Sequence, residues 1–136
     1  MLFADRASID PGISEFGELL AEYLLAVDDC RGAVLTDEDG HPIDYARRKD
    51  AISELDIQIV GAQIERPLTI LRESSRDLDA IRVTIDAARG VLVAAAIGGE
   101  YTLVALHLPA TPRRSVTQIE EDFEWLVGRV RYLIRR

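Results

Sequence analysis

The chain has 136 residues, 48% of them hydrophobic, which fits a single globular domain with one substantial core. Its net charge of −8 gives a field that repels nucleic acid and anionic lipid. The single cysteine, Cys30, excludes an internal disulfide and fits a reducing compartment. Since no segment approaches the ~20 apolar residues of a membrane span, and no signal peptide is recognisable, we expect a cytoplasmic protein without membrane insertion.

The first third of the chain predicts a helix followed by a β-hairpin. Residues 1–9 read as a short N-terminal tail, and Asp10 with Pro11 predicts a helix start, because Asp caps helices well and Pro suits the first helical position. The helix is expected to end near residue 29 and to bury one apolar stripe, which begins at Ile13. Strands are expected at residues 32–36 and 42–46, with an Asp-Gly turn between them.

The next segment, residues 51–74, predicts a helix with two apolar faces. At about 100° per residue, one stripe contains Ile57, Val60, Ile64, Leu68 and Leu71, and the other contains Ile52, Leu55, Ile59, Ala62 and Ile70. A surface helix of a small monomer needs only one such stripe, so we expect another protein chain to cover the second. The pattern does not decide which stripe faces the sheet. Asp50 is expected to cap this helix, and Pro67 is expected to kink or break it.

The last part of the chain predicts three strands and a final helix. The strands are expected at residues 78–85, 91–97 and 101–108, of which the last two are apolar on both faces. Ser115 and Gln118 have capping-box spacing at the start of the final helix. The order α-β-β-α-β-β-β-α with short turns predicts an α/β (α+β) three-layer sandwich with one sheet, formed by residues 10–136 as a single domain.

With this element order, the chain resembles the roadblock / dynein light chain family, and in particular its bacterial MglB-type regulators of Ras-like GTPases. The resemblance rests on residues 32–43, on the strands at 81–85, 90–97 and 101–108, and on the C-terminal helix. It implies a five-stranded antiparallel sheet, with the first and last helices on one face and the middle helix on the other. It also implies dimers that meet through the middle helix and a neighbouring edge strand, and a non-enzymatic role as an interaction platform.

Two surfaces are candidates for binding. The dimer or partner interface is expected to include Leu55, Ile57, Ile59, Val60, Gln63 and Ile64 of the middle helix and Ile81 and Val83 of the adjacent strand. A second partner surface is expected at Trp125, Arg129 and Tyr132, because these aromatic side chains point away from the inner stripe of the last helix and such residues are enriched at interfaces. Alternatively, the two aromatic side chains pack only against Arg129 and its neighbours.

The sequence contains no recognisable catalytic, metal or cofactor motif. The pair Asp37 and Asp39 fails the calcium-loop pattern because position 35 is Leu, and His41 and His107 lack ligand-like spacing to Cys30. No phosphate-binding loop is present, so the chain is not expected to bind nucleotide itself.

These patterns predict a non-catalytic homodimer that binds a Ras-like GTPase or a paralogous roadblock protein, with an effect on GTP hydrolysis, cell polarity or motility. Arg113 and Arg114 would be the candidates for an arginine finger. The alternative is a small-ligand sensor or a scaffold unrelated to GTPases, which would need a pocket with convergent polar groups.

Overall fold

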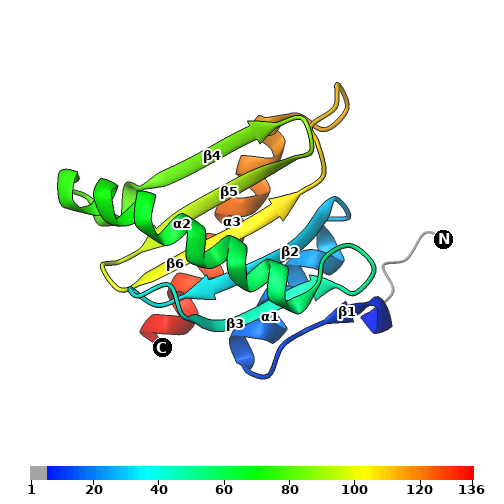
Figure 1. Ribbon diagram of the computed structural model, residues 1–136, viewed down its shortest axis with the longest axis horizontal. Coiled ribbons are helices and arrows are strands. Elements are labelled where there is room, and N and C mark those ends of the chain that lie inside the picture. The colour runs from blue at the N-terminus through cyan, green and yellow to red at the C-terminus, as the bar shows by residue number, and fades with distance from the viewer. Residues whose placement is uncertain (1–5) are drawn as a thin grey trace.

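The computed structural model describes residues 6–136 as a three-layer α/β/α arrangement (Figure 1). The elements are η1 (Arg6–Ser8), β1 (Ile9–Asp10), α1 (Glu15–Ala26), β2 (Cys30–Thr36), β3 (Pro42–Arg48), α2 (Glu54–Ser74), η2 (Leu78–Ala80), β4 (Arg82–Ala87), β5 (Gly90–Ile97), β6 (Tyr101–His107) and α3 (Val116–Arg135). The strands form one antiparallel sheet in the order β1-β3-β2-β6-β5-β4. No helix within residues 6–136 is long and apolar enough to cross a bilayer.

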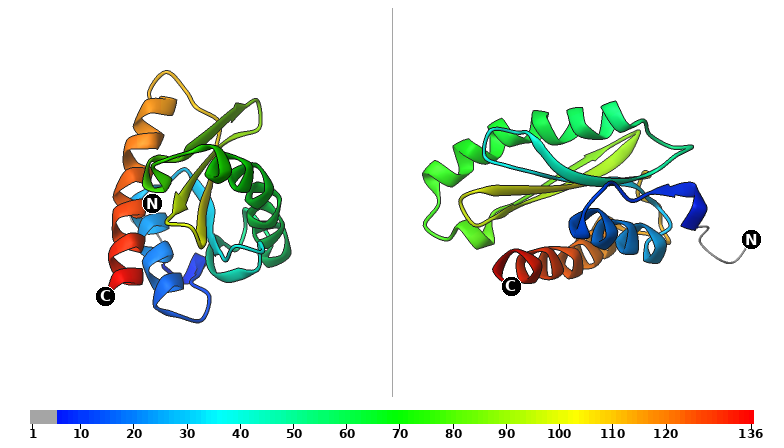
Figure 2. Two further views of the ribbon diagram at one scale, coloured as in Figure 1. Left: turned by 90° about the vertical axis from the view of Figure 1, so that its left-hand side faces the viewer. Right: turned by 90° about the horizontal axis from the view of Figure 1, so that it is seen from below.

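The sheet separates two hydrophobic cores. Helices α1 and α3 lie side by side on one face, and α2 crosses the other face alone (Figure 2). Strand β2 serves both cores, because Ala33 and Leu35 pack toward α1 and α3 whereas Val34 packs toward α2. This two-sided burial explains why the central strands are apolar at nearly every position.

A sixth strand, β1, lies at the edge of the sheet where the sequence predicted the end of a tail. Ile9 pairs with Arg48 and is only 4% exposed, and Asp10 pairs with Arg47. The Asp10 carboxylate accepts hydrogen bonds from Arg47 and from the Tyr45 hydroxyl, so it does not cap a helix. The predicted helix start at Asp10 is therefore wrong. Residues 1–5 of the expected tail lie outside the described residues.

Helix α1 instead begins at Glu15, after the cap residue Ser14. The buried carboxylate of Asp44, on β3, accepts hydrogen bonds from the backbone N–H groups of Ser14 (2.7 Å) and Gly17 (3.0 Å). Gly12, at φ +66°, and Gly17 leave no room for a Cβ: added atoms would lie 1.9 Å from an Asp44 carboxylate oxygen and from the Pro11 carbonyl oxygen, respectively. One strand carboxylate therefore fixes where the first helix begins.

Helix α2 is continuous from Glu54 to Ser74, so Pro67 does not break it, which was one of the two expected effects of this residue. Pro67 lies on the exposed side of the helix, while Ile64 and Leu68 on either side of it are buried against the sheet. The missing backbone hydrogen bond at Pro67 is therefore not enough to interrupt an element that is anchored before and after it. The cap is Ser53, not Asp50.

The ends of several other elements also differ from the sequence prediction. Helix α1 ends three residues before position 29, and β3 continues to Arg48. The segment at residues 78–80 is a 3₁₀ turn, so the expected strand at 78–85 begins only at Arg82. The capping box of Ser115 and Gln118 at the start of α3 is confirmed.

Candidate interaction surfaces

The inner stripe of α2 lies on the sheet and its second stripe faces outward. Ile57 and Leu68 are fully buried and Ile64 is 7% exposed, all within the core beneath α2. On the opposite side of the helix, Leu55, Ile59 and Ile70 are 64%, 41% and 57% exposed. We call the exposed set, Leu55, Ile59, Ala62 and Ile70, the outer α2 stripe. The apolar surface runs from Leu55 to Ala62 and resumes at Ile70, with the exposed Arg66 between them on the same side of the helix.

The residues expected at the dimer interface divide according to this geometry. Ile57, Ile64 and Ile81 are buried within the monomer, in the core between α2 and the sheet, so they are not accessible to a partner. Val60 and Val83 are half-buried at the margin of the same core. Leu55, Ile59 and Gln63 are exposed and lie together on the outside of α2.

Strand β4 forms the free edge of the sheet next to this helix. Within residues 6–136 it pairs only with β5, and the last three of its six residues are exposed. Ile85 is 47% exposed, and in Figure 1 the far end of β4 extends beyond the area that α2 covers. An unpaired edge with an exposed apolar side chain is a template for pairing with another chain.

A buried ion pair fastens the second half of α2 to the sheet. Glu65 and Arg72 are 3.0 Å apart, and their side chains are only 8% and 10% exposed. Arg72 donates to the Tyr101 carbonyl and the Thr102 hydroxyl at the start of β6, and Thr102 in turn donates to Glu65. These contacts fix the rotation of α2 about its own axis, so that the outer α2 stripe is directed away from the sheet. The sequence analysis missed them, although Glu65 and Arg72 stand seven residues apart on one helix face.

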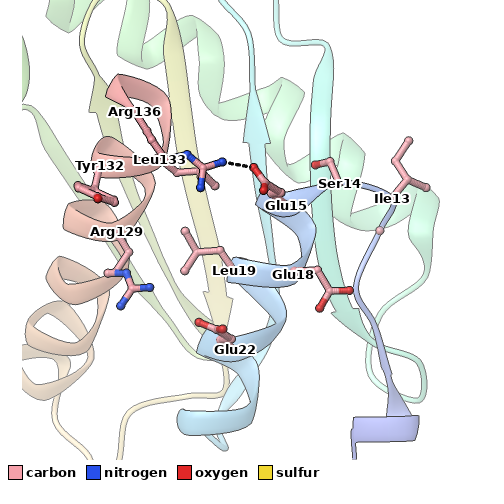
Figure 3. A pocket seen from close by; sticks show the side chains of 11 residues that line it. Ile13, Ser14, Glu15, Glu18, Leu19, Glu22, Arg129, Tyr132, Leu133 and Arg136 are labelled. Atoms are coloured by element: carbon pink, nitrogen blue, oxygen red, sulfur yellow. Dashed lines mark hydrogen bonds and ion pairs between the residues drawn. The ribbon is translucent and has the colours of Figure 1, made fainter.

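On the other face of the sheet, α1 and α3 leave a groove between them (Figure 3). The groove has a volume of about 630 Å³ and is open to solvent. Glu15, Glu18 and Glu22 line it from α1. We call this feature the α1–α3 groove.

The α3 wall of the groove carries most of the predicted second surface. Tyr132, 68% exposed, and Arg129 line the groove itself. Trp125, 45% exposed, lines an adjoining hollow of about 260 Å³ together with Ala26 and Val27 at the end of α1. The Arg129 guanidinium lies 5.5 Å from the centre of the Trp125 ring, so this packing contact also forms. Sequence reasoning found the α3 wall but missed the acidic α1 wall opposite.

The titratable groups inside the α1–α3 core are structural. The Tyr23 hydroxyl lies 2.8 Å from His107 Nε2, and both residues are buried. Burial lowers the pKa of His107 to about 4 and raises the pKa of the Cys30 thiol to about 12, so both groups are neutral at pH 7. Neither group is exposed to a substrate, and a protonated thiol in an apolar core is a poor nucleophile.

Two charged candidates from the sequence are explained by local contacts. Asp37 accepts hydrogen bonds from the backbone N–H groups of Asp39 and His41, which stabilises the β2–β3 turn; these hydrogen bonds lower the pKa of Asp37. The ligand atoms of Asp37, Asp39 and His41 lie within 4.8 Å of one another, but two of the three residues are fully exposed turn residues. Arg114 binds Asp29 at 2.9 Å and Asp122 at 2.6 Å, so it connects α3 to the end of α1.

The fold was compared with known proteins. No protein-family model and no curated protein matches the sequence. Among solved structures, a roadblock/LC7 domain from Streptomyces avermitilis superimposes with a TM-score of 0.64 at 21% identity, over 86% of this chain and 99% of that chain. The chain has the roadblock fold. MglB from Myxococcus xanthus gives a TM-score of 0.67 at 13% identity, over 90% of this chain and 98% of that chain.

MglC from Myxococcus xanthus is a further relative in fold, with a TM-score of 0.55 at 19% identity, over 88% of this chain and 98% of that chain. The resemblance seen in the sequence is therefore confirmed at the level of the fold. The expected five-stranded sheet is corrected to six antiparallel strands in the described part of the chain, because the two-residue β1 adds to the edge at β3. The roadblock arrangement places α2 alone on one face of this sheet.

Proposed function

We propose that this chain is a non-catalytic homodimer that binds a Ras-like small GTPase or a paralogous roadblock protein. The outer α2 stripe carries the proposal. Leu55, Ile59 and Ile70 are exposed apolar side chains on one side of α2, spread along about 15 residues of helix. Exposed apolar surface of this kind marks an interaction site.

A two-fold axis near the middle of α2 fits the stripe. If the axis passes between Ala62 and Gln63 and the helices run antiparallel, Leu55 of one copy lies beside Ile70 of the other. The small side chain at position 62 allows the two helices to approach closely at the centre. An isologous contact of this type uses the same patch on both copies, as most homodimers do.

The edge strand supports the same arrangement. Strand β4 has its outer backbone edge free and carries Ile85 on the surface beyond α2. Pairing of two β4 edges would satisfy these backbone groups and extend the sheet across the dimer. The helix and the strand edge would then belong to one interface.

The GTPase part of the proposal rests on the resemblance to MglB-type regulators and on the shared fold with MglB of Myxococcus xanthus. The buried titratable groups His107 and Cys30 are neutral and Arg114 is engaged with Asp29 and Asp122, which leaves the exposed Arg113 as the remaining candidate for an arginine finger. The proposed action of this chain is to position or bridge partners. The alternative of a small-ligand sensor has less support, because both cores are filled by apolar side chains.

Molar mass from light scattering tests the dimer. We expect the wild type to be dimeric at tens of micromolar, and the double variant Leu55→Asp/Ile59→Asp to be a folded monomer with an unchanged circular dichroism spectrum. Leu108→Asp is the matched control, since Leu108 is 48% exposed but lies outside the proposed interface. A wild type that is strictly monomeric, or a double variant that stays dimeric, would contradict the proposed interface.

GTP hydrolysis tests the partner. Wild-type protein is used to recover small GTPases and roadblock paralogues from extract of the source cells, and hydrolysis by each recovered GTPase is then measured with and without the protein. We expect direct binding by the wild type and a clear loss of binding by Leu55→Asp/Ile59→Asp, because a GTPase platform depends on the assembled dimer. Recovery of neither class of protein would remove the proposed function.

A further inference from the structure

The α1–α3 groove lies on the face of the molecule opposite the outer α2 stripe, so the proposed dimer leaves it open (Figure 2). Its apolar base includes Leu19 from α1 and Leu133 from α3. Tyr132 on its rim is 68% exposed and Ile13 at its end is 96% exposed. The described residues give these two large side chains little cover, although such groups favour burial.

The two walls of the groove differ in charge. Glu15, Glu18 and Glu22 follow one another at intervals of three and four residues along the α1 wall, so they form one acidic edge. Arg129 and Arg136 lie along the α3 wall, and Figure 3 shows the Arg136 guanidinium reaching Glu15 across one end. The groove is therefore negative on one side and positive on the other.

The ion pairs already present do not neutralise this pattern. Arg136 binds Glu15 at 2.5 Å and Arg6 binds Glu18 at 2.6 Å, but all four side chains are more than half exposed. Exposed pairs of this type contribute little to stability, so a partner can exchange them at little cost. Glu22 forms no ion pair with another residue in the described range.

The shape and length of the groove select a helical occupant. At 1.5 Å per residue, the α3 wall from Arg129 to Arg136 is about 10 Å long, which matches two turns of helix. A second copy of the chain would present the same concave surface, and two concave surfaces leave a void between them. A single helix is convex and can place one apolar stripe into the groove.

We propose that the α1–α3 groove binds one amphipathic helix of a partner protein. Its apolar stripe packs on Leu19, Tyr132 and Leu133. Basic residues on one flank of the stripe meet the glutamates of α1, and acidic residues on the other flank meet Arg129 and Arg136. Because the two charged walls differ in sign, they fix the orientation of the helix. This site works whether or not the outer α2 stripe forms a dimer, so one chain could join two partners.

Selection from a displayed library of helical peptides on the wild-type protein tests the proposal. We expect enriched peptides to carry an apolar stripe with basic residues on one flank and acidic residues on the other. Fluorescence anisotropy with the best peptide should show at least a tenfold weaker affinity for Tyr132→Ala, while Leu108→Ala, a control outside the groove, binds as the wild type does. Tyr132 is exposed, so its loss should leave the circular dichroism spectrum unchanged.

A charge reversal makes the test more specific. The variant Glu18→Lys/Glu22→Lys should select peptides that carry acidic residues on the flank where the wild type selects basic ones. The variant Leu55→Asp/Ile59→Asp should bind the wild-type peptide with unchanged affinity, which separates this site from the proposed dimer.

Three outcomes would overturn the groove proposal. The selected peptides bind Tyr132→Ala as tightly as the wild type, the charges of the selected peptides do not change with Glu18→Lys/Glu22→Lys, or no peptide is enriched. A change in molar mass caused by Tyr132→Ala would instead assign the groove to a second copy. A thermal shift by a small metabolite that Tyr132→Ala abolishes would assign it to a ligand. Either result would replace the helix as the occupant.

Discussion

The two faces of the sheet are covered in different ways. Two helices, α1 and α3, pack over one face and bury aromatic side chains such as Tyr23 and Phe123 between themselves and the sheet. A single helix, α2, covers the other face, and it is held by a smaller apolar core and by the buried Glu65–Arg72 pair. The outer side of α2 carries the exposed Leu55, Ile59 and Ile70. The exposed large apolar side chains of the other face, Ile13, Trp125 and Tyr132, lie at the α1–α3 groove and the hollow beside it.

The largest expected effect comes from placing a charge on the buried side of α2, compared with the same charge on its exposed side. Ile57→Asp puts a carboxylate into a fully buried site, so we expect a loss of more than about 4 kcal/mol in the free energy of unfolding. Ile59→Asp, two residues along on the exposed side, should cost the monomer less than about 1 kcal/mol. Urea titration measures both values, and equal losses would mean that α2 has no distinct inner and outer faces.

The buried ion pair should give the next largest effect. Glu65→Ala leaves the Arg72 guanidinium buried without its carboxylate, and we expect a loss of about 3–5 kcal/mol in the free energy of unfolding. The double variant Glu65→Leu/Arg72→Met should lose less than the single variant, because no unpaired charge remains. If the double variant loses more than the single one, the pair is not the anchor of α2 described above.

Substitutions of two helix glycines, one on each face of the sheet, should change the stability in opposite directions. A Cβ at Gly61 of α2 would lie 2.8 Å from side-chain atoms of Val34 and Thr36, so Gly61→Val should cost about 1–3 kcal/mol. A Cβ at Gly128 of α3 meets no other atom within 4 Å, so Gly128→Ala should stabilise the protein by about 0.5–1 kcal/mol. Thermal unfolding should give shifts of opposite sign, and a gain at both positions would show that α2 does not lie so close to β2.

The α1–α3 core should also carry a pH dependence, smaller than the effect of breaking the buried ion pair. Burial lowers the pKa of His107 to about 4 from an unperturbed value of 6.5, so protons bind more readily to the unfolded state. The free energy of unfolding should therefore be highest above about pH 6.5. It should fall as the pH drops toward 4, by about 2 kcal/mol between pH 7 and pH 5. In His107→Gln this part of the loss should disappear, as urea titrations of both proteins at each pH would show.

Much of the fold could be predicted from patterns that repeat along the chain. Alternation and continuous apolar runs located the strands around Val34, Val93 and Val104. The two faces of the middle helix were recognised, but Ile52 of the outward-facing stripe is buried in the core beneath α2, and Leu71 of the inward-facing stripe is 40% exposed. β1 has only two residues and therefore no period to detect, and the start of α1 is held by Asp44, which lies 30 residues from Ser14 in the sequence. Such contacts depend on tertiary structure, which local propensities do not contain.

The candidate sites show the same limit. The sequence singled out Trp125 and Tyr132 because they break the inner stripe of their helix. It gave no comparable signal for Glu18 and Glu22, because glutamates on a helix surface are ordinary until a second helix is packed beside them. Glu65 was missed because its burial is accompanied by a hydrogen bond from Thr102, which lies on a strand much later in the chain.

The carboxylate of Asp44 has a consequence for how this chain can change during evolution. It occupies the space that side chains at Gly12 and Gly17 would need, and it holds the N–H groups that start α1. Gly12 and Gly17 are also constrained by the backbone, because Cβ atoms there would lie 2.6 Å from the Tyr45 carbonyl oxygen and 1.9 Å from the Pro11 carbonyl oxygen. Close relatives that lack an acid at position 44 are therefore expected to keep both glycines and to begin α1 with a different cap.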